Sequence, residues 1–270
     1  MTTRNDIPSD LEQVLISTRY EVEKHLQSRA FVGIIALVMA VLALMTVAMP
    51  ALGLSFSSNA VDFVQNYTTW IEIIVLIAAV AFASGALSSE FERRTGLLMF
   101  PQPVKRTTYL MGKYLSSIIM TGVALGIYYV LVSLMSLAIV GSIPGAILIS
   151  FGLAMLYGAA VCAVAFLFSA LLKTNTAAIV ATVLTFLMVM TIVSQLLSMS
   201  GVDPFFLASN ASGTISFSLQ DPYPVTHTTL MGDMSSTTFV PSETGAAMVL
   251  IGYIVVSLLV STVLFRRKQF

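Results

Sequence analysis

The chain has 270 residues, of which 57% are hydrophobic and 10% are charged, and its formal net charge is zero. Soluble domains average about 25% charged residues, so this composition excludes an ordinary soluble protein and indicates a polytopic membrane protein. The single cysteine, Cys162, lies in an apolar run, where we expect a small core residue. We expect neither a secretory signal peptide nor a nucleic-acid partner.

Residues 1–29 are predicted to contain an amphipathic helix on the cytoplasmic side or in the membrane interface. Ser9 and Glu12 form a capping-box pattern at its start. Apolar positions recur at helical spacing and form one stripe, made of Leu11, Val14, Leu15, Thr18, Val22 and Leu26. Because the first apolar span follows almost at once, we favour a helix lying in the interface. Packing of this helix on a protein partner is the alternative.

Six apolar segments follow, each about long enough to cross ~30 Å of hydrocarbon. We predict an all-α transmembrane domain over residues 30–265, with spans at about 30–50, 69–88, 114–140, 146–172, 176–199 and 245–265. Glu72 lies at the predicted start of the second span, where a carboxylate can reach headgroup water. Away from their ends the spans carry no acidic or basic residue, so we expect no catalytic residue and no metal site.

The basic residues predict the orientation of these spans. All 13 Lys and Arg lie in the N-terminal segment, in the loop at 89–113, at Lys173, and in the tail at 266–270. The loops at 51–68, 141–145 and 200–244 carry none. The positive-inside rule therefore predicts that both termini and the 89–113 loop are cytoplasmic.

The 200–244 loop is rich in Ser, Thr, Pro and Gly with interspersed aromatic residues. Loops of this length are usually functional or disordered, and the aromatic residues favour a folded extracytoplasmic cap between the fifth and sixth spans. Two glycosylation sequons, at Asn66 and Asn210, fall in segments placed outside.

Residues 88–115 form a charged island between two apolar spans. Its acidic and basic residues are Glu90, Glu92, Arg93, Arg94, Lys105, Arg106 and Lys113. A segment with this charge cannot enter the hydrocarbon core.

The order of residues in this loop resembles the loop between the second and third spans of type 2 ABC transporter permeases. That family carries an E-x-E pattern followed by Gly, then P-V-x-R, then G-K before the third span. The matching residues are Glu90, Glu92, Gly96, Pro103, Val104, Arg106, Gly112 and Lys113. The resemblance implies a permease that works as a dimer, with a similar or identical second copy and two ATPase subunits.

The resemblance also implies a coupling role for the loop. The apolar residues at 97–100, Leu97 and Phe100 among them, would enter a groove in the ATPase. Charged residues would set the angle of docking through ion pairs at the rim, namely Glu90, Glu92, Arg93, Arg94 and Arg106. The alternative is that the arginines only anchor the loop to anionic lipid headgroups.

We therefore predict a permease subunit of an ATP-driven exporter in the cell membrane. The chain has no G-x-x-x-x-G-K-[ST] loop, so ATP would be bound by a separate chain and this chain would bind no cofactor and be no enzyme. One alternative is a membrane assembly or maturation factor that uses an ATPase, because similar permeases lie beside copper-enzyme maturation systems. The other is a gradient-driven carrier, which the scarcity of charge within the spans disfavours.

Overall fold

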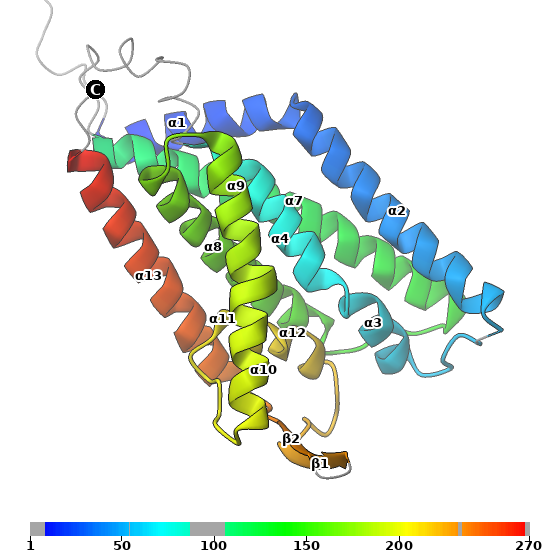
Figure 1. Ribbon diagram of the computed structural model, residues 1–270. Coiled ribbons are helices and arrows are strands. Elements are labelled where there is room, and N and C mark those ends of the chain that lie inside the picture. Colours follow the sequence, from blue (N-terminus) through cyan, green and yellow to red (C-terminus); the bar gives the residue numbers. More distant parts are fainter. Residues whose placement is uncertain (1–8, 54, 87–105, 232–233, 268–270) are drawn as a thin grey trace, which may run out of the picture.

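The computed structural model describes residues 9–53, 55–86, 106–231 and 234–267. These residues form a helical bundle with one small β-hairpin (Figure 1). The elements are α1 (Asp10–Leu26), α2 (Arg29–Ala51), α3 (Ala60–Thr68), α4 (Ile71–Ala83), α7 (Arg106–Ile139), α8 (Ile147–Leu171), α9 (Asn175–Leu184), the π-helix η1 (Thr185–Met190), α10 (Thr191–Met199), α11 (Ala208–Ser212), α12 (Thr214–Phe217), β1 (His227–Met231), β2 (Met234–Thr238) and α13 (Glu243–Arg267).

The predicted all-α membrane fold is confirmed. Among the described residues, five helices are long and apolar enough to cross a membrane: α2, α7, α8, the continuous α9–η1–α10 rod, and α13. The pair α3 and α4, bent by 42° at a short break, makes a sixth if it is one span. Helix α2 runs away from α1 to the opposite end of the bundle (Figure 1). The bent pair α3–α4 then runs back, so that α4 ends near the first turns of α7, at the end of the bundle where α1 lies.

The second span differs from its prediction. Residues 60–68, expected to be part of an outer loop, form α3, which Asn59 caps by accepting the backbone N–H of Val61 at 3.0 Å. One face of α3 is buried against the bundle, including Phe63, Val64 and Tyr67. Since α3 carries polar residues on its other face, its composition resembles that of a loop. As a result, Glu72 lies inside the bent pair and not at its beginning.

Helix α8 is the centre of the bundle, in contact with α4, α7, α9 and α13. It is buried on most sides because its inward residues are small, including Ala154, Ala160, Ala163 and Ala165. At Gly158 an added Cβ would lie 3.2 Å from Thr121 on α7 and 3.3 Å from Val75 on α4. Three helices therefore pack closely at this glycine, and a larger residue there would require its neighbours to shift.

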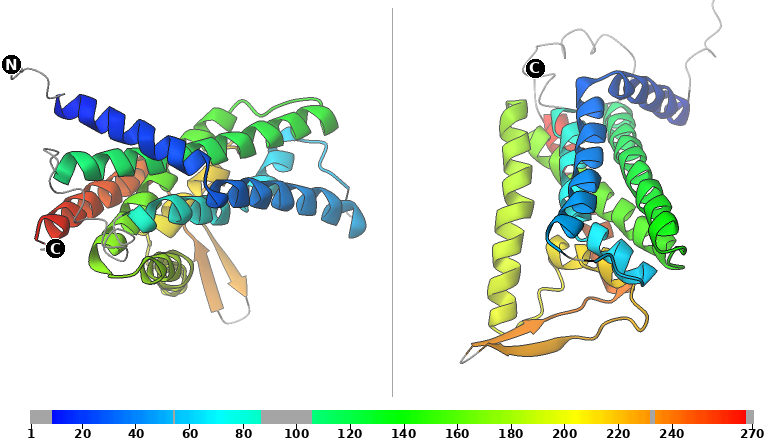
Figure 2. Two further views of the ribbon diagram at one scale, coloured as in Figure 1. Left: turned by 90° about the horizontal axis from the view of Figure 1, so that it is seen from above. Right: turned by 90° about the vertical axis from the view of Figure 1, so that its right-hand side faces the viewer.

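The segment between the last two spans is folded, and part of it is buried within the helical bundle and does not only cover its surface. Helices α11 and α12, which together form a plug, insert into the end of the bundle away from α1, where Leu207, Ala208, Ala211 and Ile215 are buried. The Ser150 hydroxyl on α8 donates to the Ile215 carbonyl at 2.6 Å. The β1–β2 hairpin projects beyond this plug (Figure 2). The sequence did not predict the hairpin, because its short strands are rich in Ser and Thr and lack apolar alternation.

Candidate functional site

The loop predicted to be the functional site lies largely outside the described residues. This applies to Glu90, Glu92, Arg93, Arg94, Gly96, Leu97, Phe100 and Pro103. The structure does describe the two anchor points of the loop, which are the end of α4 and the beginning of α7. Arg106 is the first residue of α7, and Lys113 lies two turns further along the same helix.

Lys113 is buried, with 5% of its surface exposed. Its Nζ lies 3.3 Å from Glu21 Oε1 on α1 and donates to the carbonyl of Ala86 at 3.0 Å, just past the end of α4. The same ammonium group lies 4.9 Å from the centre of the Tyr109 ring. One cation therefore connects α1 to both helices that flank the loop.

Glu21 is the acidic partner in this cluster. Its second oxygen, Oε2, accepts a hydrogen bond from Lys24 at 3.0 Å. Burial by itself would raise the pKa of Glu21, but the ammonium groups of Lys113 and Lys24 outweigh burial and hold the pKa below its usual value. The stabilisation from this pair is therefore present above the ordinary glutamate pKa and is lost only as the pH falls through the lowered folded-state value.

Close approach of the two helices at Gly112 allows this ion pair to form. An added Cβ at Gly112 would lie 2.6 Å from Ser17 Oγ and 3.4 Å from the Val14 carbonyl oxygen, both on α1. The Thr18 hydroxyl contacts the Gly112 carbonyl at 3.3 Å. Glycine therefore lets the two backbones meet, and the Gly112-Lys113 pair of the sequence motif is a docking point for α1.

The packing continues toward the first span through apolar contacts. The His25 ring meets the Phe82 ring edge-on at 5.3 Å. Burial lowers the pKa of His25, although the charge of Glu21 acts in the opposite direction, so at neutral pH the uncharged ring packs here. Phe82 belongs to a separate buried cluster with Ile34, Ala78, Met120 and Ala124. Helices α1, α2, α4 and α7 are thus joined at one end of the bundle (Figure 2).

The buried face of α1 is rotated from the predicted apolar stripe. Leu11, Leu15 and Leu26 are 70%, 55% and 45% exposed. The packed face keeps Val14, Thr18 and Val22 of that stripe and adds Ser17 and Glu21 in place of the exposed leucines. The ion pair and the close approach at Gly112 fix this rotation. The exposed leucines beside it can still face the membrane interface.

Sequence reasoning missed Glu21, although a signal was present. Thr18, Glu21 and His25 recur at helical spacing within one stripe, and a polar run of this kind on an amphipathic helix indicates a buried protein contact. Lys113 was identified, but only as a member of a loop motif.

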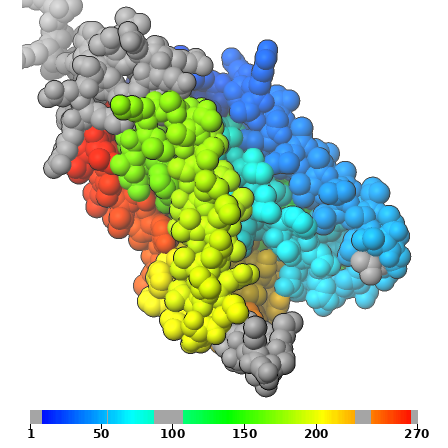
Figure 3. Space-filling model, in the orientation of Figure 1, coloured from blue at the N-terminus to red at the C-terminus, as the bar shows by residue number. Residues whose placement is uncertain are grey.

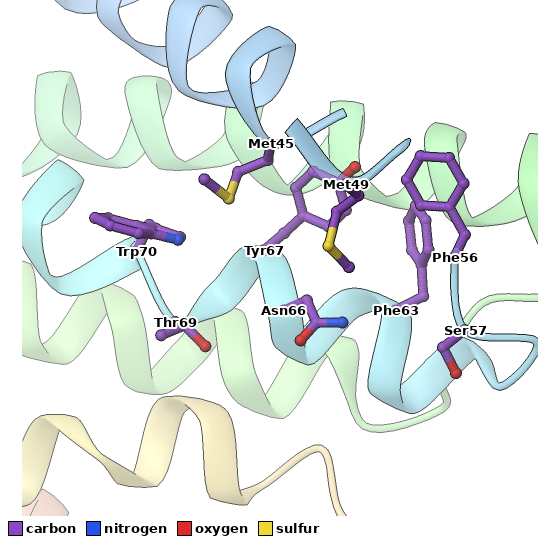
Figure 4. Close-up of a pocket in the computed structure, with 9 residues that line it drawn as sticks. All are labelled: Met45, Met49, Phe56, Ser57, Phe63, Asn66, Tyr67, Thr69 and Trp70. Carbon is purple, nitrogen blue, oxygen red and sulfur yellow. The ribbon is translucent and has the colours of Figure 1, made fainter. Parts of the chain in front are cut away.

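A pocket of about 270 Å³ lies at the opposite end of the bundle between α2, α3 and the start of α4 (Figure 4). Its lining is mostly aromatic and sulfur-containing, with a few polar groups: Met45, Met49, Phe56, Ser57, Phe63, Asn66, Tyr67, Thr69 and Trp70. Such a lining suits apolar or aromatic groups. The described residues contain no group of three or more His, Cys, Asp or Glu that could hold a metal ion.

Comparison with known proteins gives one family match. The family model described as "ABC-2 family transporter protein" matches residues 15–270, which is nearly the whole chain. The comparison with curated proteins finds no match.

Proposed function

Since the chain belongs to the ABC-2 family of transporter proteins, we propose that it is the permease of an exporter whose 88–115 loop docks on a separate ATPase subunit. The observation that carries this proposal is the buried Lys113–Glu21 cluster. It holds both anchor points of the loop against α1, so force applied to the loop reaches three helices at once. Breaking a buried ion pair is costly, so the pair keeps the base of the loop and α1 together when the loop is moved.

Coupling would proceed through rigid elements. Closure of the ATPase on bound ATP moves the loop, and the loop moves α4 and α7 together because Lys113 bonds to the end of α4. Helix α1 follows through Glu21 and Gly112, and α2 follows α1 across a two-residue connection. ATP is bound by the partner, and this chain contributes movement and not hydrolysis.

A second permease copy completes the transporter. Helices α9 to α10 form a ridge along one face of the molecule (Figure 3). This ridge carries several exposed apolar side chains, including Leu187, Met188, Val189, Ile192 and Leu196. Membrane lipid and a second copy of the chain are the two surroundings such a surface fits.

The docking role predicts the effect of apolar-to-acidic changes in the loop. Leu97→Asp and Phe100→Asp are expected to abolish co-purification of the ATPase, since an apolar interface anchor is replaced by a charge. Arg93→Ala is expected to weaken the association at low salt, and the difference from wild type should shrink as added salt screens the charge. Co-purification of the tagged permease with its ATPase measures this, and unchanged membrane insertion is the control. ATPase recovery equal to wild type in both Asp variants would leave the loop as a headgroup anchor and refute the proposal.

The location is the cell membrane, with both termini cytoplasmic. Helix α1 and the last turn of α13 lie at the same end of the bundle (Figure 1), and the sequence restricts its 13 Lys and Arg to the segments that the positive-inside rule predicts to be cytoplasmic. In a Cys162→Ala background, cysteines at Asp62 and Asp203 are expected to react with an impermeant thiol reagent added outside intact cells. A cysteine at Lys173 should react only after the cells are opened. Labelling of position 173 from outside would reverse the orientation.

A further inference from the structure

Glu72 has a position that its sequence context did not reveal. It is the second residue of α4 and lies 14 positions before Ala86, where Lys113 marks the α1 end of the span. With α3 and α4 counted as one bent span over residues 60–83, Glu72 lies near the middle of the span and not at its end.

Nothing in the sequence can supply a basic side chain to this carboxylate. No Lys or Arg occurs at residues 30–92, 114–172 or 174–265, which include every outer segment. A second copy of the same chain has the same distribution and cannot supply one either. An acidic group at this depth is costly unless a positive charge or a proton neutralises it.

The hydrogen bonding around Glu72 is also incomplete. In the described part of the chain its hydrogen-bond partner is the Ser212 hydroxyl on the α11 plug, at 2.7 Å. That hydroxyl also lies 2.8 Å from the Ser209 carbonyl oxygen. A hydroxyl has one proton, so it cannot donate fully to both acceptors. Ionised Glu72 is therefore only partly satisfied by Ser212, even with the favourable dipole at the start of α4.

The surroundings favour an organic cation over a metal ion. Divalent ions need several oxygen ligands, whereas the site offers one carboxylate and one hydroxyl. An alkylammonium group carries one positive charge and so matches a site with one carboxylate.

We infer that Glu72 binds a positively charged ammonium group of the transported molecule, next to the α11 plug. The inference rests on the proposed transport function and names its cargo class as cationic amphiphiles. The Ser212 contact then has a second consequence. A cation that draws the carboxylate away from Ser212 leaves the Ser212 hydroxyl to donate to the Ser209 carbonyl alone. The hydrogen bond between α4 and the α11 plug is then lost.

The single tryptophan, Trp70, provides a reporter two residues from Glu72. The purified full chain is reconstituted in phosphatidylcholine vesicles without the ATPase. Trp70 quenching is measured with two nitroxides that share an octyl chain and end in a trimethylammonium or an uncharged hydroxyl group. We expect quenching by the cationic probe at about tenfold lower concentration, as one ion pair between its trimethylammonium group and the carboxylate implies.

Glu72→Gln should remove this preference while keeping the plug, because the amide oxygen still accepts from Ser212. Asp62→Asn removes the same charge from the first turn of α3 and should retain the preference. Equal quenching by both probes in wild type, or equal loss in both variants, would show that Glu72 is a protonated structural group and overturn the inference. The ATPase is absent, so this result does not depend on whether the loop docks it.

Discussion

Replacing Lys113 with methionine is expected to lower the free energy of unfolding by about 3 kcal/mol, because it leaves the buried Glu21 without its principal counter-charge. The side chains of Lys113 and Glu21 are only 6% and 7% exposed, so water cannot solvate the remaining charge. The loss should lie at the lower end of the range for broken buried pairs because Lys24 still bonds to one oxygen of Glu21. Thermal or denaturant unfolding of the purified chain in detergent measures it.

Two further variants separate charge from packing. Glu21→Leu combined with Lys113→Met removes both charges and should return to within about 1 kcal/mol of wild type, since buried pairs can be replaced by apolar residues at little cost. The control is the exposed pair Arg19–Glu23 on the same helix, with a distance of 3.0 Å and side chains 84% and 57% exposed. Arg19→Met should cost only about 0.2–1 kcal/mol. Equal losses for Lys113→Met and Arg19→Met would refute the buried cluster.

The double variant also tests coupling. If the ion pair transmits movement from the loop to α1, the double variant should fold normally but show weaker stimulation of the ATPase by cargo. Normal stimulation would mean that the pair contributes stability alone, with transmission carried by the contact at Gly112.

Gly112→Ala is expected to destabilise the chain by about 1–3 kcal/mol, because the added methyl group would overlap Ser17 on α1. The sign of the change in stability shows whether the two helices touch at this position. Alanine favours a helix over glycine by about 1 kcal/mol, so replacing a glycine that has free space around it should stabilise the chain. Unfolding under the same conditions as for Lys113→Met provides the measurement.

Gly126 supplies the matched control, since it lies in α7 as well and an added Cβ would meet nothing within 4 Å. Gly126→Ala should be neutral or stabilising. Ser17→Gly should rescue Gly112→Ala because it removes the atoms that clash. Destabilisation by both alanine variants alike, or failure of the rescue, would mean that α1 does not pack on α7 as described.

These variants change contacts at the α1 end of the bundle, whereas the contact between Glu72 and Ser212 lies toward the other end. Between them lie α4 and α8, packed together at Gly158. Since α4 carries Glu72 in its first turn and ends beside the Lys113 contact, a shift of α4 would change both sites. This makes α4 the shortest rigid connection between loop and plug.

The sequence by itself determined the class of the protein. Long apolar runs must cross a membrane or be buried, and basic residues restricted to alternate loops predict one orientation. For this reason the all-α fold and the permease family could be predicted from composition, spacing and a short motif. The positions of α2, α8 and α13 follow the apolar segments closely for the same reason.

Only the tertiary structure decided which polar residues are buried and which of them contact one another. Glu21 and Lys113 are far apart in the chain and look like surface residues, because charge in a sequence does not show whether a partner lies opposite. The face of α1 that packs, the extension of the second span by α3 and the contact between Glu72 and Ser212 likewise depend on how helices cross. Periodicity fixes which residues share a face of a helix, but the neighbour of that face is set by packing between distant segments.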